Sequence, residues 1–391
     1  MNNFTYYTPT KVLFGEGRVK EVGEALKSFG ATNILIVYGS KRIEKSGLLA
    51  SVIEILDNTG IKYKTLSGVE PNPLLAKVYE GIDIVKKNKI DFLLAIGGGS
   101  VIDTTKAIGY GVYNGGDAWD FYSKKRKPEG SMPLGVILTM AAAGSEMSDS
   151  SVITNGETKE KRGCNTNYCR PKFAIMDPNL TVTVPDYQTM SGCCDILMHT
   201  MERYFTRGGN LDISDEIAEG LMRTVFKYGD ILHNNPDDVK ARAEVMWASS
   251  LSHNGLTGCG NDGGDFMSHK LEHELSGKYN VTHGAGLSVI WPAWAEYVYM
   301  NNLDRFYKYA KNVLGIEGTD RMDVAKRGIR RTKEIFTSWG LPVKMREMNI
   351  NPTQEDIADM ARSCLESCGG PKGSSRLLDL CDMINIYTNA L

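Results

Sequence analysis

Hydrophobic and polar positions change period along the first half of the chain. Short, continuously apolar runs end in turns of glycine, serine or alanine, at residues 33–38, 91–96 and 133–139. Such runs are typical of buried parallel strands. Two further strand patterns occur, at 4–14 and 62–67. Between these runs, apolar residues recur every three or four positions and predict helices, at 19–29, 48–56, 75–87 and 101–110.

The strand pattern disappears from Gln188 onward. Helical periodicity dominates the rest of the chain, at 217–228, 239–251, 303–313, 324–339 and 354–364. A chain of 391 residues is long enough for two domains. We therefore predict an α/β N-terminal domain, residues 1–185, with a mostly parallel, Rossmann-like sheet, followed by an all-α C-terminal domain, residues 186–391.

Composition excludes several classes of function. The net charge of −2 provides no basic field for nucleic acid or acidic lipid. No apolar stretch approaches the roughly 20 residues that span a bilayer, and the N-terminus does not resemble a signal peptide, so a cytoplasmic location is expected. The eight cysteines include no C-x-x-C pair and are expected to be reduced thiols.

Potential metal ligands are concentrated in residues 268–289. This stretch contains three of the six histidines, namely His269, His273 and His283. His269 and His273 are four residues apart, so they share one face of a helix, and upstream Asp195 and His199 have the same spacing. Two helices that each present such residues meet the needs of a carboxylate and imidazole site for a divalent metal.

A second candidate site follows the run at 91–96, where Gly97, Gly98, Gly99 and Ser100 separate a predicted strand from a helix. Glycines let a backbone approach a phosphate closely, and the helix N-terminus offers unpaired N–H groups. The order is not G-x-G-x-x-G, and a simple tight turn is the alternative interpretation. Its place at the end of a parallel strand favours pyrophosphate binding.

The end of the run at 33–38 bears on the choice of cofactor. An acidic residue there would bind the 2′-hydroxyl of NAD(H), but the chain has Gly39, Ser40, Lys41 and Arg42. Small and basic residues leave room and charge for a 2′-phosphate, which favours NADP(H) over NAD(H). The alternative is a solvated basic helix start.

Taken together, these motifs resemble the iron-containing, group III alcohol dehydrogenase family, and within it the bacterial NAD(P)H-dependent butanol dehydrogenases. The resemblance runs nearly end to end, through GVEPNP (68–73), AIGGGSVIDTTK (95–106), GSEM (144–147), DILMHTMERYF (195–205), HKLEHELSG (269–277) and THGAGL (282–287). It implies the two-domain architecture shared with dehydroquinate synthase. It also implies a homodimer or a larger homo-oligomer.

The resemblance also implies roles for individual residues. The metal ligands would be Asp195, His199, His269 and His283. His273 would lie near the nicotinamide and is the candidate proton relay. The cofactor would contact Gly39, Ser40, Lys41, Asn72, Gly97, Gly98, Gly99, Ser100, Thr139, Lys161 and Leu180. The chain departs from its relatives at Ala143, where they commonly have threonine, and at Ser148, where some NADP-preferring relatives have an amide.

The expected activity is hydride transfer between nicotinamide and a primary alcohol or aldehyde such as butanol or butanal. The donor set without thiolate suits Fe(II), which is favoured, or Zn(II). The alternatives are a polyol or diol dehydrogenase, a lyase resembling dehydroquinate synthase, and a binding protein without turnover. No nucleic-acid or membrane partner is expected.

Overall fold

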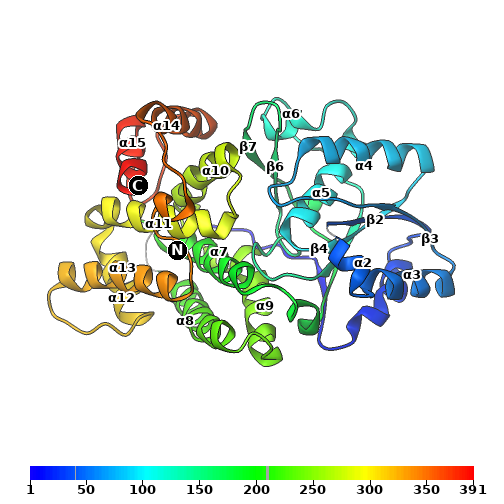
Figure 1. Ribbon diagram of the computed structural model, residues 1–391, viewed down its shortest axis with the longest axis horizontal. Coiled ribbons are helices and arrows are strands. Elements are labelled where there is room, and N and C mark those ends of the chain that lie inside the picture. Colours follow the sequence, from blue (N-terminus) through cyan, green and yellow to red (C-terminus); the bar gives the residue numbers. More distant parts are fainter. Residues whose placement is uncertain (40, 208–210) are drawn as a thin grey trace. The chain divides into compact units, whose positions relative to one another are not determined.

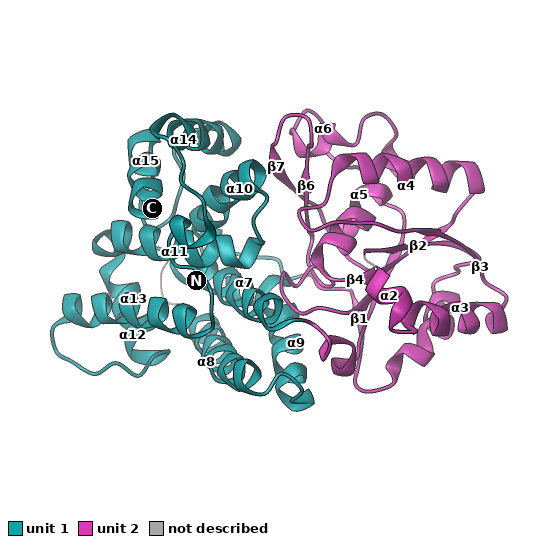
Figure 2. Ribbon diagram, in the orientation of Figure 1, with its two compact units in different colours: residues 1–6, 185–391 teal, residues 7–184 magenta. Residues whose placement is uncertain are grey.

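The computed structural model describes residues 1–39, 41–207 and 211–391, which form two compact units (Figures 1 and 2). One unit comprises Tyr7–Val184 and carries the sheet. The other comprises Met1–Tyr6 and Pro185–Leu391 and is helical. The first six residues, which the sequence pattern placed with the sheet, belong to the helical unit, where the Asn2 backbone N–H donates to the Gly260 carbonyl at 2.9 Å.

Six parallel strands form the sheet, in the order β1-β8-β5-β4-β2-β3. Their bounds are β1 Lys11–Phe14, β2 Asn33–Tyr38, β3 Lys62–Leu66, β4 Phe92–Gly97, β5 Leu134–Leu138 and β8 Phe173–Met176. The predicted parallel sheet is therefore confirmed. The sequence pattern missed β8, which has only four residues and lacks the length on which periodicity depends.

Helices cover both faces of this sheet (Figure 1). Their bounds are α1 Val22–Ser28, α2 Lys41–Lys45, α3 Leu48–Thr59, α4 Leu75–Asn88, α5 Gly99–Asn114 and α6 Trp119–Tyr122. On one face, Ile34 and Ile36 of β2 pack in a core with Val52 of α3. On the other face, α5 packs so closely that a Cβ at Gly109 would lie 3.6 Å from Leu93 of β4. Burial on both faces explains why the strands are continuously apolar.

An antiparallel hairpin of β6 Ser150–Thr154 and β7 Lys161–Asn165 was not predicted. Its strands read SSVIT and KRGCN, and such polar sequences have no clear apolar alternation. Pairing rather than apolar burial of one face defines the hairpin, and it fixes Lys161 opposite Thr154.

The helical unit has no strand among its described residues, apart from an isolated bridge between Lys372 and Leu378. Its helices are α7 Asp186–Tyr204, α8 Asp212–Asn234, α9 Val239–His253, α10 Met267–Tyr279, α11 His283–Val298, α12 Leu303–Asn312, α13 Arg321–Ser338, α14 Gln354–Cys368 and α15 Leu380–Asn389. The predicted all-α character is confirmed. Helices α7 and α11 are buried along most of their length and pack against each other.

Short 3₁₀ helices complete the secondary structure, at η1 Arg18–Glu21, η2 Asn167–Cys169, η3 Pro178–Thr181, η4 Leu256–Gly258, η5 Tyr299–Asn302 and η6 Met345–Met348. Within the described ranges, every helix is too short or too polar to cross a membrane.

A fully buried lysine fixes the loop after β5 to α5. The ammonium group of Lys106 donates to the backbone carbonyls of Ser145, Ser148 and Ser150 at 2.7, 3.0 and 2.7 Å. Asp103, one turn earlier on α5, accepts from the Ser145 hydroxyl at 2.6 Å. Segment 145–150 is therefore held by charge-assisted bonds rather than by an apolar core.

We expect Lys106→Met to destabilise the protein markedly. The substitution leaves three carbonyl oxygens without their donor, and each buried unsatisfied group costs about 1–3 kcal/mol, so the loss should reach at least about 3 kcal/mol. Urea unfolding would measure it. Lys64→Met on β3, where the lysine is exposed, is the matched control and should change stability by less than about 0.5 kcal/mol. Equal effects of the two substitutions would contradict this interpretation.

Candidate functional site

Three helices of the helical unit supply the predicted metal ligands. Asp195 and His199 lie one turn apart on α7, His269 lies in the first turn of α10, and His283 is the first residue of α11. Helix α10 follows Phe266, which has a positive φ of 57°. Such a backbone is unusual for a bulky residue and sets a sharp entry to the helix.

The three imidazoles converge on one carboxylate oxygen. His199 Nδ1 lies 3.1 Å from Asp195 Oδ1, His269 Nε2 lies 3.7 Å from it, and His283 Nε2 lies 3.8 Å from it. The ligand atoms of Asp195, His199 and His269 all lie within 4.8 Å of one another. The structure therefore brings together the four side chains that were predicted as ligands.

Two atoms of this cluster have surroundings that a bound cation would satisfy. Asp195 Oδ1 and His269 Nε2 are buried, and neither has a hydrogen-bond partner among the residues that the structure describes. Leaving such atoms unsatisfied in a protein interior is costly unless a further group binds them. The donors are carboxylate oxygen and imidazole nitrogen, which suit a divalent transition metal. The residues present thus fit a metal ion.

The pKa values of these side chains follow from their burial and their closeness to one another. Burial alone would raise the pKa of Asp195, but the neighbouring His199 and His283 outweigh it and hold that pKa well below its usual range. Burial lowers the pKa of His199 to about 4. Burial acts in the same sense on His269, but Asp195 and Glu202 overcome it and raise the pKa of His269 to about 9. The carboxylates thus make the cluster a site for positive charge.

Two buried glutamates support the histidines, and the sequence analysis did not assign them a role. Glu202 Oε1 accepts from the backbone N–H of His269 at 3.0 Å and lies 3.1 Å from its Nδ1. Glu272 Oε2 is hydrogen-bonded to His283 Nδ1. The available signal was spacing, because Glu202 follows His199 by three residues and Glu272 follows His269 by three.

His273 lies beside this cluster, one turn after His269 on α10. Its ring centroid is 5.7 Å from that of His283, and ligand atoms of Glu272, His273 and His283 lie within 4.8 Å of one another. The side chain is buried. The geometry therefore keeps His273 near the cluster but outside the group formed by Asp195, His199 and His269.

The candidate phosphate site lies in the sheet unit, between β4 and α5. Helix α5 begins at Gly99, with Gly98 as its N-cap. Strand β4 pairs with β2 on one side and with β5 on the other. After β2 the chain continues to β3, away from β4, whereas after β4 it continues to β5, away from β2. The carboxyl ends of β2 and β4 therefore border the point where the strand order reverses, which is where open α/β sheets bind ligands.

Close packing explains the glycines at this point. A Cβ at Gly97 would lie 2.5 Å from Val101 Cγ2, and one at Gly98 would lie 3.2 Å from the Cβ of Met140. A Cβ at Gly99 would lie 3.2 Å from that of Ala143, the position at which the chain departs from its relatives. The glycine run thus packs against the loop after β5 and leaves the N–H groups of α5 at the sheet edge.

The other predicted cofactor residues that the structure describes lie in several parts of the sheet unit. Gly39 follows β2, and a Cβ there would lie 3.5 Å from Val101 of α5. The Thr139 N–H donates to the Gly97 carbonyl at 3.1 Å, and the ammonium of Lys161 donates to Asn72 Oδ1 at 2.9 Å. Of the remaining positions, Ser100 lies in the first turn of α5, Lys41 is exposed at the start of α2, Leu180 packs against the sheet core, and Ser40 lies outside the described residues.

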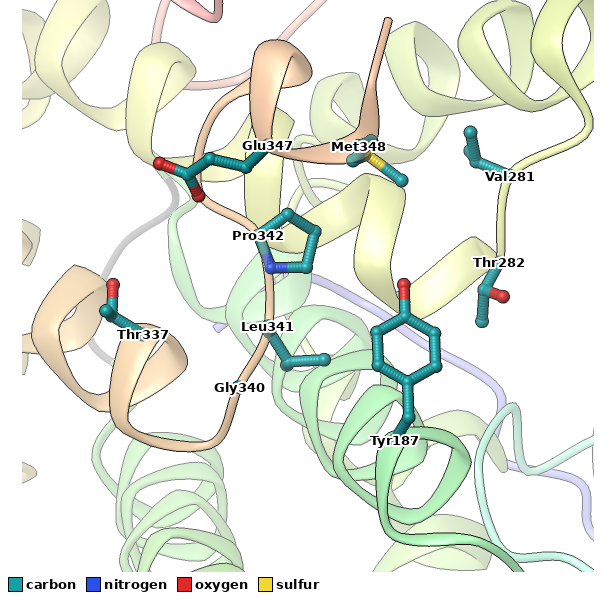
Figure 3. A pocket seen from close by; sticks show the side chains of 9 residues that line it. All are labelled: Tyr187, Val281, Thr282, Thr337, Gly340, Leu341, Pro342, Glu347 and Met348. Carbon is teal, nitrogen blue, oxygen red and sulfur yellow. The ribbon is translucent and has the colours of Figure 1, made fainter.

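A separate pocket of about 450 Å³ opens on the helical unit (Figure 3). It is lined by Tyr187, Val281, Thr282, Thr337, Gly340, Leu341, Pro342, Glu347 and Met348. The Tyr187 ring extends into it from the start of α7, as Figure 3 shows. The lining includes none of the predicted ligands or cofactor residues, although Thr282 immediately precedes His283.

Comparison with known proteins covers nearly the whole chain. NADH-dependent butanol dehydrogenase A of Clostridium acetobutylicum is 42% identical over 389 residues, which are 99% of each chain. The NADPH-dependent aldehyde reductase YqhD of Escherichia coli is 33% identical and covers 90% of each. The crystal structure of NADH-dependent butanol dehydrogenase A from Thermotoga maritima superposes with a TM-score of 0.96 at 37% identity, over 100% of this chain and 99% of that one.

Family models agree with these similarities. Residues 9–178 match the model for iron-containing alcohol dehydrogenase, and residues 189–391 match the model for the C-terminal part of the Fe-containing alcohol dehydrogenase family. The chain therefore belongs to the iron-containing alcohol dehydrogenase family and is a metal-dependent, nicotinamide-linked alcohol dehydrogenase.

Proposed function

We propose that this enzyme transfers hydride between a nicotinamide cofactor and a primary alcohol or aldehyde of about the size of butanol or butanal. The observation that carries the proposal is the convergence of three imidazoles on Asp195 Oδ1. Such a centre suits a substrate that binds through one oxygen. The names of the 42% and 33% identical relatives, a butanol dehydrogenase and an aldehyde reductase, support the substrate class.

We infer that Asp195, His199, His269 and His283 hold one divalent metal, Fe(II) by preference and Zn(II) as the alternative. When bound, a divalent metal supplies Lewis acidity, which favours ionisation of an alcohol and polarises the carbonyl of an aldehyde. The protein contributes the fixed donor geometry. Glu202 and Glu272 hold two of the imidazoles in place, so little reorganisation is needed when charge develops.

His273 is our candidate for the proton relay. An imidazole titrates near neutrality and is suited to exchanging a proton with an alcohol oxygen. Its ring centroid lies 5.7 Å from that of His283, so it is close to the proposed ligands without being one of them.

For the cofactor, we propose that the N–H groups at the start of α5, in residues 97–100, bind the pyrophosphate. Gly39, Ser40 and Lys41 would face the adenosine ribose, and Asn72, Thr139, Lys161 and Leu180 would complete the cofactor site. The sheet unit would thus be the dinucleotide-binding domain and the helical unit the metal-binding domain.

We further propose a preference for NADP(H) over NAD(H). The first carboxylate after β2 is Glu44, and its Oε1 already accepts from the Tyr38 hydroxyl at 2.8 Å. The exposed Lys41 offers charge for a 2′-phosphate. The relatives differ in this property, since the butanol dehydrogenase is named as NADH-dependent and the aldehyde reductase as NADPH-dependent.

The protein is proposed to act in the cytoplasm as a homodimer or larger homo-oligomer. In the sheet unit, strand β1 lies at the edge of the sheet, and the large residue Tyr7 shortly before it is exposed. Such a surface is typical of an interface between subunits. Light scattering on the purified protein would determine the assembly.

Removing one proposed ligand should abolish metal binding and turnover. We expect His269→Ala to lose nearly all bound metal and to lower kcat by at least about 100-fold, because the remaining donors leave the coordination incomplete. Dinucleotide binding, measured by nicotinamide fluorescence, should persist. His233→Ala is the matched control, since His233 is not a proposed ligand and its Nδ1 instead lies 3.1 Å from Asp186 Oδ2. Wild-type turnover in the His269 variant would refute the ligand assignment.

Cofactor preference should respond to a carboxylate after β2. We expect Gly39→Asp to lower kcat/KM with NADPH at least about tenfold relative to NADH, because a carboxylate repels the 2′-phosphate and accepts a bond from a 2′-hydroxyl. A new Cβ would meet the Val69 carbonyl at 3.1 Å, so Gly39→Ala controls for crowding. An unchanged ratio in the aspartate variant, or the same change in the alanine variant, would contradict this prediction.

Substrate profiling separates an alcohol dehydrogenase for simple aliphatic substrates from a polyol enzyme. After removal of metal and anaerobic reloading with Fe(II) or Zn(II), we expect NADPH oxidation with butanal to exceed that with dihydroxyacetone by at least about tenfold in kcat/KM. The two hydroxyl groups of dihydroxyacetone would lose their hydration in the site, whereas butanal has no hydroxyl group to desolvate. The reverse order would identify a polyol or diol dehydrogenase. Binding of dinucleotide without turnover of any aldehyde would instead indicate a lyase or a binding protein.

A further inference from the structure

Each imidazole of the cluster is tied at Nδ1 to an oxygen that can only accept. His269 Nδ1 lies 3.1 Å from Glu202 Oε1, His283 Nδ1 contacts Glu272 Oε2, and His199 Nδ1 lies 3.1 Å from the Asp195 carbonyl oxygen. A neutral imidazole has one N–H, and a strong acceptor beside Nδ1 fixes the proton there. The lone pair is then left on Nε2, the atom that His269 and His283 turn toward Asp195 Oδ1.

We propose that Glu202 and Glu272 are positioning residues that set the Nε2 tautomer of His269 and His283 and thereby prepare the centre for metal. The inference rests on the ligand set of the proposed function. It adds to that set two carboxylates that do not touch the metal but act through the histidines. Their removal should weaken metal binding while leaving all four ligands in the chain.

The surroundings of Glu272 fix the position of its carboxylate. This side chain is fully buried, and its other oxygen, Oε1, accepts from the hydroxyl of Ser276 one turn further along α10. A Cβ at Gly286, in the first turn of α11, would lie 2.6 Å from Glu272 Oε1. Only glycine allows α11 to approach this carboxylate so closely, and the approach brings His283 to Glu272.

Glu202 also orients a histidine, but through different contacts. Its Oε1 binds both the backbone N–H and the ring of His269, which fixes the position and the rotation of that side chain together. Its Oε2 is buried and has no hydrogen-bond partner within the described part of the chain. If this carboxylate only joined α7 to α10, burying its charged Oε2 without a partner would destabilise the fold. A nearby cation would offset the charge.

Metal affinity tests the inference directly. Glu202→Met and Glu272→Met keep most of the side-chain volume but remove the acceptor, and we expect each to raise the Kd for Zn(II), measured by competition with a chromophoric chelator, about 10–100-fold. Glu202→Gln and Glu272→Gln retain an acceptor oxygen and should lose less than about tenfold. Glu219→Gln is the control, because Glu219 is equally buried in this unit but binds Tyr204 and Asn312 instead of a histidine.

A second measurement reports the tautomer itself. With only six histidines, selective ¹⁵N-histidine labelling of the Zn(II)-loaded protein should resolve each ring by NMR. We expect Nδ1–H for His269 and His283 in the wild type. Loss of that signal at His269 in Glu202→Met and at His283 in Glu272→Met would be a change that a merely structural role would not produce.

The outcomes distinguish a wrong ligand set from a wrong positioning role of the two glutamates. If His269→Ala binds Zn(II) as the wild type does, the ligand set of the proposed function is wrong. If His269→Ala loses Zn(II) but both methionine variants bind it with unchanged Kd, the ligand set stands and the positioning role is overturned. If a methionine variant does not fold, the wild-type spectrum still decides, since Nε2–H at His269 or His283 would overturn the inference.

Discussion

The organising constraint of the helical unit is the convergence of His199, His269 and His283 on one oxygen of buried Asp195. Helix α7 must pass this oxygen with its middle turns, while α10 and α11 must begin beside it, and the packing around them serves this arrangement. A Cβ at Gly284 would lie 1.9 Å from the Ser191 carbonyl, so only glycine lets α11 start this close to α7. The approach of backbones, rather than side-chain length, brings His283 to the cluster.

The secondary structure of each unit suits the chemistry that we propose for it. Helices place donors four residues apart on one face and bury them, which is what a metal ion with nitrogen and oxygen ligands requires. Parallel strands end together at one edge, and α5 begins there after the Gly97 carbonyl that accepts from the Thr139 N–H. The buried Lys106 then fixes the loop that packs on that edge without occupying it.

Features that depend on local pattern were predictable from the sequence. Continuous apolar runs gave the strands at 33–38 and 91–96, and the spacing of Asp195 and His199 indicated one helical face. Features that depend on distant partners were not. The hairpin of β6 and β7 is defined by pairing between polar strands, and Glu202 acts on a histidine 67 residues away. Its spacing from His199 is equally typical of an ordinary helix charge, because nothing local distinguishes a buried carboxylate from a solvated one.

Two adjacent cysteines on α7 lie next to a proposed ligand in sequence but outside the potential metal clusters. Cys193 and Cys194 directly precede Asp195, and thiolates would be strong ligands for a soft metal. Burial raises the pKa of Cys193 to about 12 and that of Cys194 well above its usual value, so both remain neutral thiols. No cysteine occurs in the potential metal clusters among the described residues. The donor set that we propose is therefore oxygen and nitrogen without thiolate, and such a set suits Fe(II) as well as Zn(II).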